Sequence, residues 1–202
     1  MSPSRRILLA MLLAAAAATP AVAQTRPAAR LRGTIASVSG DTLSVTTHAG
    51  KTVQVALQAD TGVTWVVPAS LDDIAKGSFI GTAAMPGPDG ALMALEVHVF
   101  PESMRGTGEG HRPFDLQPES TMTNGTVGDV VAAAGRTLTV TYKGGQQKVV
   151  VPPGTPIVGF APADRGALAA GAHVILFGSS NPDGSVTAAR VLVGKDGLVP
   201  PM

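Results

Sequence analysis

The 202-residue chain contains no cysteine, carries a formal net charge of +1 and has only 3% aromatic residues. The missing cysteines exclude disulfides and thiol chemistry, and a near-neutral chain with so few aromatic side chains lacks the basic, stacking surface that nucleic acids require. Its 24 glycines and 16 prolines exceed the usual combined share of about 12% and lie between apolar runs, which predicts short strands joined by many turns.

The first 23 residues have the pattern of a signal peptide. Arg5 and Arg6 precede an apolar run over residues 7–18, and Ala21 to Ala23 fits an A-x-A cleavage site. That run is shorter than the roughly 20 residues that cross a bilayer, so we do not expect this chain to be an integral membrane protein. We expect a periplasmic or secreted protein, cleaved near Ala23, whose mature chain begins with a tail over residues 24–30.

Apolar and polar residues alternate with period two through most of the mature chain. Residues 42–46 and 52–57 each place apolar side chains on one face, and turn-forming residues at 39–41 and 49–50 separate these runs. This pattern is typical of short antiparallel strands with one buried face. We assign residues 31–100 to a first β-barrel repeat.

The same order of features returns about 94 residues later. The later copy occupies residues 124–195, and residues 196–202 form a C-terminal tail. The matching segments are 32–35 with 124–127, 42–46 with 137–141, 51–55 with 147–151, and 88–90 with 182–184. The offset between matching segments changes little along the chain, so we expect insertions only in loops, as in a duplicated folding unit.

One short helix is predicted in each copy. Ser70 and Asp73 form a capping-box pattern that Gly77 ends, and residues 164–170 are compatible with a helix or a 3₁₀ turn in the second copy. Three strands, a short helix and two strands is an order that resembles the OB-fold. The resemblance implies a mainly β protein with two tandem five-stranded OB-like Greek-key barrels, each with one short helix between strands three and four.

A polar joint without periodicity separates the copies, over residues 101–123. Loops of this length are often functional. Just before it, Glu96 and His98 share one face of a strand, whereas the matching positions of the second copy hold Arg190 and Leu192. A purely structural repeat gives no reason for this difference. The candidate ligand or partner surface comprises Glu96, His98, Arg105, Glu109, His111, Arg112 and Asp115.

The same stretch allows a metal interpretation. His98, Glu109, His111 and Asp115 carry imidazole and carboxylate groups that suit zinc or another divalent ion, although their spacing matches no established ligand motif. The simpler interpretation is a solvated linker with ion pairs. Glycines at 106, 108 and 110 lack the strand and helix that phosphate-binding loops require.

The chain also resembles an exported bacterial family of unknown function. The resemblance covers most of the mature chain and rests on four segments: residues 32–35, 70–74, 96–102 and 105–111. Some relatives carry the label "metal ABC transporter permease". A permease needs several membrane-spanning helices, and the single short apolar run does not provide them.

We therefore expect a non-enzymatic binding or envelope-interaction module rather than an enzyme. The mature chain contains no G-x-S-x-G motif and no evident set of serine, histidine and carboxylate. The expected partner is a small ligand or an envelope protein, with no cofactor; the alternative is a periplasmic protein that binds a divalent metal. We further expect Phe100, Phe114 or Phe160 to pack between the barrels, because such a contact needs apolar surface.

Overall fold

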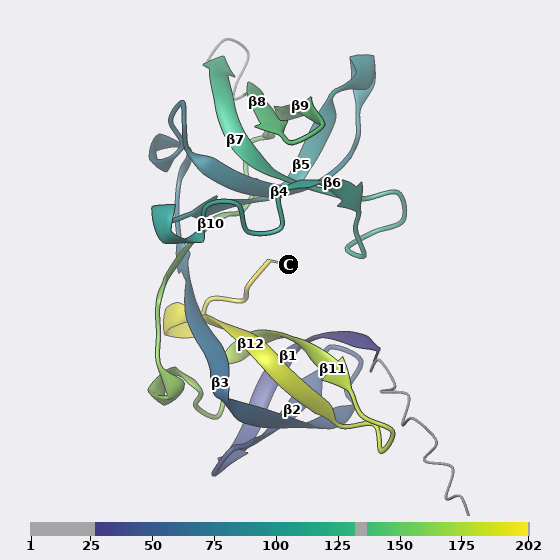
Figure 1. The fold of residues 1–202 in the computed structure, drawn as a ribbon, viewed down its shortest axis with the longest axis vertical. Helices are drawn as coiled ribbons and strands as arrows, with labels where there is room; N and C mark the ends of the chain where they lie inside the picture. The colour runs from purple at the N-terminus through teal and green to yellow at the C-terminus, as the bar shows by residue number, and fades with distance from the viewer. Residues whose placement is uncertain (1–26, 132–136, 202) are drawn as a thin grey trace, which may run out of the picture.

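The computed structural model describes residues 27–131 and 137–201 (Figure 1). The predicted signal peptide lies outside these residues. Within these residues twelve strands form one continuous sheet, with four 3₁₀ turns between strands and a fifth after the last strand. The strands are β1 (Ala28–Ser39), β2 (Thr42–Thr47), β3 (Thr52–Pro68), β4 (Phe79–Pro86), β5 (Leu92–Phe100), β6 (Gly110–Pro113), β7 (Thr121–Val131), β8 (Thr137–Tyr142), β9 (Gly145–Val150), β10 (Ile157–Pro162), β11 (His173–Ser180) and β12 (Val186–Gly194). The 3₁₀ turns are η1 (Leu71–Asp73), η2 (Pro88–Gly90), η3 (Glu102–Met104), η4 (Arg165–Ala167) and η5 (Lys195–Gly197).

A closed five-stranded barrel forms the first lobe, at the bottom of Figure 1. Its strands pair in the order β1-β2-β3-β12-β11, and β11 pairs again with β1. All of these pairs are antiparallel except that of β12 with β3. The apolar residues of the predicted period-two runs, such as Leu43, Val45 and Val55, are fully buried inside it. The alternation therefore identified the core face of these strands correctly.

The second lobe has the same strand order. Here β7-β8-β9 pair in succession, β4 lies between β5 and β7, and a short parallel contact joins β5 to β9 at Leu92↔Val149 and Met93↔Val150. Strand β6 adds to the edge of β7. Val97, Leu138 and Val149 belong to the buried core of this lobe.

The predicted closure of each half on itself is wrong. The first lobe takes β1, β2 and β3 from residues 31–100 but β11 and β12 from residues 124–195, and the second lobe has the reverse arrangement. The cause lies in β3, which runs for 17 residues without a turn. Its beginning pairs with β2 and its end, Thr64 to Pro68, pairs with β10, so it carries the chain out of one lobe and into the other (Figure 1).

The two predicted helices are single 3₁₀ turns. In η1 the Asp73 Oδ2 atom accepts a hydrogen bond from the Ser70 amide at 2.8 Å, and in η4 Asp164 Oδ1 accepts one from the Gly166 amide at 2.8 Å. The capping pair of Ser70 and Asp73 was therefore identified correctly, but each segment is too short to offset the cost of nucleating an α-helix. No helix in ranges 27–131 and 137–201 is long and apolar enough to cross a bilayer.

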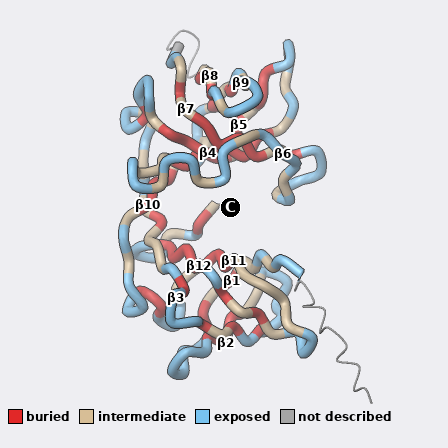
Figure 2. The backbone as a smooth tube through the Cα atoms, in the orientation of Figure 1, coloured by how far each residue is buried: buried red, intermediate tan, exposed pale blue. Residues whose placement is uncertain are grey.

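A third apolar cluster joins the lobes. Phe100 of β5 and Phe160 of β10 lie with ring centroids 5.0 Å apart, and they pack with Ile175 and Leu192 of the first lobe. Figure 2 shows buried segments on both sides of this junction. The predicted packing of Phe100 and Phe160 between the lobes is confirmed. Leu198 of the C-terminal segment packs on the same cluster, and the chain ends between the lobes (Figure 1).

Candidate ligand-binding cavity between the lobes

A cavity of about 110 Å³ lies where the lobes meet. Its walls come from β1, β11 and β12 of the first lobe, from β5, β6 and β7 of the second, and from β10. Phe100, Phe160 and Leu192 make the inner wall apolar, whereas the outer part is cationic. A wider, shallower depression of about 640 Å³ shares Arg30 and Phe114 with this cavity. The cavity therefore has an apolar interior beside a cationic, more open surface.

Three arginines from three strands line this cavity: Arg30, Arg112 and Arg190. The guanidinium carbon of Arg30 lies 4.6 Å from the ring centroid of Phe114 and 5.3 Å from that of Phe177, and Arg190 lies 4.7 Å from Phe177. Partial burial, reinforced by the charge of Arg30, lowers the pKa of both Arg112 and Arg190 from the ordinary value. These cations therefore lie close enough to repel one another, which makes the cavity electropositive.

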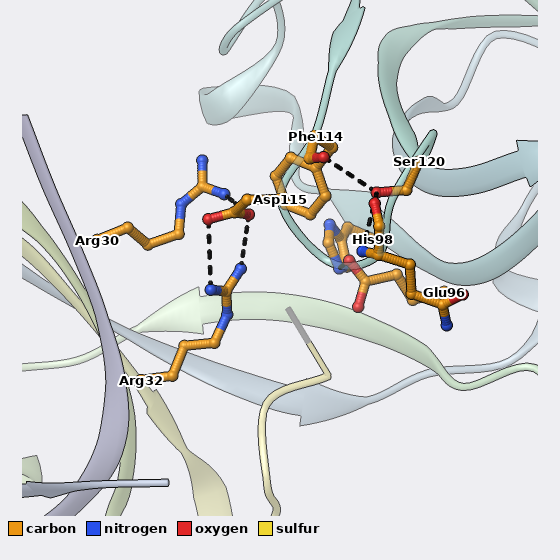
Figure 3. A network of polar contacts seen from close by, with 8 residues as sticks. Arg30, Arg32, Glu96, His98, Phe114, Asp115 and Ser120 are labelled. Carbon is orange, nitrogen blue, oxygen red and sulfur yellow. Dashed lines mark hydrogen bonds and ion pairs between the residues drawn. The ribbon is translucent and has the colours of Figure 1, made fainter. Parts of the chain in front are cut away.

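Few acceptors compensate these charges. Arg112 donates a hydrogen bond to the Gly108 carbonyl at 2.7 Å. Asp115 accepts from Arg30 and, at 3.0 Å, from Arg32 (Figure 3). Within the described part of the chain, no acceptor is hydrogen-bonded to Arg190, which has only its ring contact with Phe177. Among the described residues, Arg112 and Arg190 are thus both without an anionic partner.

Asp115 links the two lobes. It lies in the loop after β6, and its arginine partners come from β1 of the first lobe (Figure 3). Partial burial acts to raise the pKa of Asp115, but the hydrogen bond from Arg32 and the charges of Arg30 and Arg32 outweigh it and lower the pKa. Asp115 therefore stays ionised at the rim of the cavity.

Glu96 and His98 lie beneath the cationic rim, and both side chains are about 1% exposed. The His98 Nε2 atom is 3.3 Å from Glu96 Oε1, and the His98 ring lines the cavity edge-on to Phe160. Neither carboxylate oxygen has a hydrogen-bond partner among the described residues. A buried carboxylate is costly without a compensating charge or proton, so these two side chains act as one unit.

Glu96 and His98, which were placed on the candidate ligand or partner surface, are both buried. The strand alternates as predicted, since Val97 faces the core of the second lobe. The opposite face of β5 is covered instead by Phe160 and the junction with the first lobe. Alternation correctly separated the two faces but could not show that both are buried.

The remaining predicted site residues divide into two groups. Arg112 lines the cavity and Asp115 lines the adjoining depression. Arg105 instead pairs with Glu102 at 2.6 Å, Glu109 accepts a hydrogen bond from the Lys143 amide at 2.9 Å, and the His111 Nδ1 atom lies 2.8 Å from Thr123 Oγ1. None of these last three, Arg105, Glu109 and His111, is part of the cavity wall.

The predicted metal ligands do not converge. His98, Glu109, His111 and Asp115 each have a separate partner, as described above, and the described residues contain no group of three or more His, Asp or Glu side chains placed to hold a metal ion. Four such residues close in sequence do not assemble a metal site when each side chain has a separate partner.

Arg30 and Phe177 line the cavity but were not predicted from the sequence, and Arg190 was noted only as the counterpart of Glu96. The available signal was the predicted repeat, because Arg30 precedes the matched segment 32–35 just as Met122 precedes 124–127, and both line the cavity.

Comparison with known proteins gives one match. Residues 124–191 match the model of DUF5666, a domain of unknown function. The DUF5666 match begins in β7 and ends in β12, so its strands belong to both lobes. No curated protein and no solved structure matches the chain. Nothing in these comparisons supports the transporter label of the family that the sequence resembles.

Proposed function

We propose that this chain is a non-enzymatic binding protein of the cell envelope that holds a small molecule in the cavity between its lobes. The proposal rests on the matched positions at which the two halves of the sequence carry different residues. Positions that match between the halves are similar in the cores and dissimilar around the cavity.

Several features support the interpretation that the halves are copies of one unit. Strands β1 and β7 have register shifts at matching places, after Ile35 and Val127. Gly33 and Gly125 also match: a Cβ atom would lie 2.2 Å from the Thr46 carbonyl oxygen at the first and 2.4 Å from that of Thr141 at the second. Each glycine thus allows the same close approach of two strands.

Core positions of the copies are conservative pairs. Leu43 matches Leu138, and Val97 matches Val191, all fully buried. Around the cavity the pairs differ in charge. The differing pairs are Arg30 with Met122, Arg32 with Asn124, Glu96 with Arg190, and His98 with Leu192. Six of these side chains line one small cavity, and the buried Glu96 lies against one of them, His98. Packing alone does not call for such differences, whereas recognition of an asymmetric ligand does.

Binding is favoured over catalysis by the groups present. Catalysis by His98 would need a nucleophile or a substrate proton within hydrogen-bond reach, and no hydroxyl in the described part of the chain is hydrogen-bonded to it. The arginines, by contrast, are suited to holding a charged group without reacting with it.

The proposal is tested by filling the cavity. Met122→Trp places a larger side chain in the cavity wall, and Val38→Trp, on an exposed position of β1, is the matched control. Native mass spectrometry of protein isolated from the envelope should find a small molecule on the wild type and on the Val38 variant but not on the Met122 variant. Circular dichroism checks that all three are folded. The proposal is contradicted if the wild type carries no small molecule, or if a folded Met122→Trp variant carries as much of it as the wild type.

A further inference from the structure

We propose that the molecule held between the lobes is a small organic anion, an oxyacid with a compact apolar body. This inference rests on the proposed function and names the class of ligand. It depends on three properties of the cavity: its size, its uncompensated positive charge and its apolar inner wall.

The size limits the ligand. A water molecule takes up about 30 Å³ in the liquid, so 110 Å³ has room for about 4 non-hydrogen atoms. A small carboxylic acid such as benzoate would therefore place only part of itself in this cavity. The rest would lie in the shallower depression, which shares Arg30, Arg112, Phe114 and Phe177 with the cavity.

The positive charge of the cavity determines the sign of the ligand's charge. Arg190 and Arg112 line the cavity, and among the described residues neither forms an ion pair. The guanidinium carbons of Arg30 and Arg190 lie 5.3 and 4.7 Å from the ring centroid of Phe177. Among the described residues no acceptor is hydrogen-bonded to the N–H groups of Arg190, and such groups match the oxygens of a carboxylate or phosphate.

The sharing of Asp115 strengthens this argument. Asp115 satisfies the arginines of β1 at the rim, and its own side chain is 54% exposed. Among the described residues Asp115 is not paired with Arg112 or Arg190, and the other nearby carboxylate, Glu96, lies against His98. Burial and, second, the charge of Arg30 lower the pKa of Arg112 and of Arg190, and a bound anion would offset both effects.

The apolar wall determines the rest of the molecule. Phe100, Phe160 and Leu192 line the same cavity, and Phe160 and Leu192 are buried. An inorganic ion would leave that wall without contacts, and a neutral apolar molecule would leave the arginines without an acceptor. A molecule with an oxyanion at one end and a planar apolar body at the other satisfies both.

The test compares three probes on the full protein by titration calorimetry: benzoate, the uncharged isostere benzamide, and inorganic phosphate. A charge-assisted contact predicts that benzoate binds about 10- to 100-fold more tightly than benzamide. Benzoate should also bind more tightly than phosphate, which cannot contact the apolar wall. In Arg190→Met, benzoate should lose this advantage while benzamide binding stays unchanged.

Arg105→Met is the matched control, because Arg105 lies outside the cavity wall. It should bind all three probes as the wild type does. Equal affinity for benzoate and benzamide would overturn the inference while leaving the proposed function intact. Stronger binding of phosphate than of benzoate would contradict the inference that the ligand has an apolar body. Benzoate binding that survives both Arg190→Met and Met122→Trp would place the probe elsewhere and also overturn the inference.

Discussion

Replacement of Arg190 by methionine separates a binding role from a structural one. Its guanidinium lies 4.7 Å from the centroid of Phe177 and that of Arg30 lies 5.3 Å from the same point, so at most about 10 Å separate the two charges. At that distance their repulsion is about 0.4 kcal/mol in bulk water and about 1.7 kcal/mol at an effective dielectric constant of about 20. The contact with Phe177 that the variant loses contributes about 0.5–1 kcal/mol.

These two effects have opposite signs, and methionine keeps most of the apolar stem that packs on the ring. We therefore expect Arg190→Met to change the free energy of unfolding by less than about 1 kcal/mol. Urea unfolding followed by circular dichroism measures this directly, with Arg105→Met as the control. A loss of more than about 2 kcal/mol would show that Arg190 holds the fold, and the reasoning that assigns it to a ligand would be wrong.

Three further predictions concern the junction of the lobes. Asp115→Asn should lower the free energy of unfolding by no more than about 1 kcal/mol at pH 7, because the carboxylate is half exposed. Since the folded pKa of Asp115 is lowered, the wild type should be the more stable protein at neutral pH. In acid unfolding curves this difference should disappear as the pH falls through the lowered pKa. His98→Leu should destabilise the protein by about 3–5 kcal/mol by leaving the Glu96 carboxylate buried alone, and adding Glu96→Leu should recover much of it; additive losses in a double-mutant cycle would refute the coupling. Trp65 fluorescence and that of a Trp65→Phe, Tyr142→Trp variant should report coincident urea midpoints, because each lobe needs strands from both halves of the chain; two separated transitions would contradict this.

Strand positions and core faces could be predicted from the sequence, but strand partners could not. A period of two shows which side chains share a face, and Leu43 and Leu138 are buried as that rule requires. It does not show which strand lies alongside. The residues Asp60 to Gly62 have the composition of a turn, yet β3 continues through them, with a shift in its register to β12. A turn there would have returned the chain to its own barrel; its absence sends β4 and β5 to the other lobe.

The candidate site was predictable only in part, for the same reason. Glu96 and His98 were singled out because they differ from their counterparts in the predicted second copy; His98 lines the cavity, and Glu96 lies against His98. The polar joint was singled out by composition, and there only Arg112 and Asp115 contribute. Composition cannot distinguish charges that pair locally, such as Arg105 with Glu102, from charges that the fold gathers from distant strands.

Strand exchange also explains how one cavity can have two different sides. Taken as copies of one unit, the halves place matching strands β5 and β12 on opposite sides of the junction, so Glu96 and His98 lie across from Arg190 and Leu192. In a symmetric dimer of a single repeat, both sides would carry the same residues, because an isologous interface repeats every substitution. With both copies in one chain, each side can change independently. A buried acid and imidazole on one strand and a guanidinium on the other then become possible, and an asymmetric organic anion can bind in one orientation.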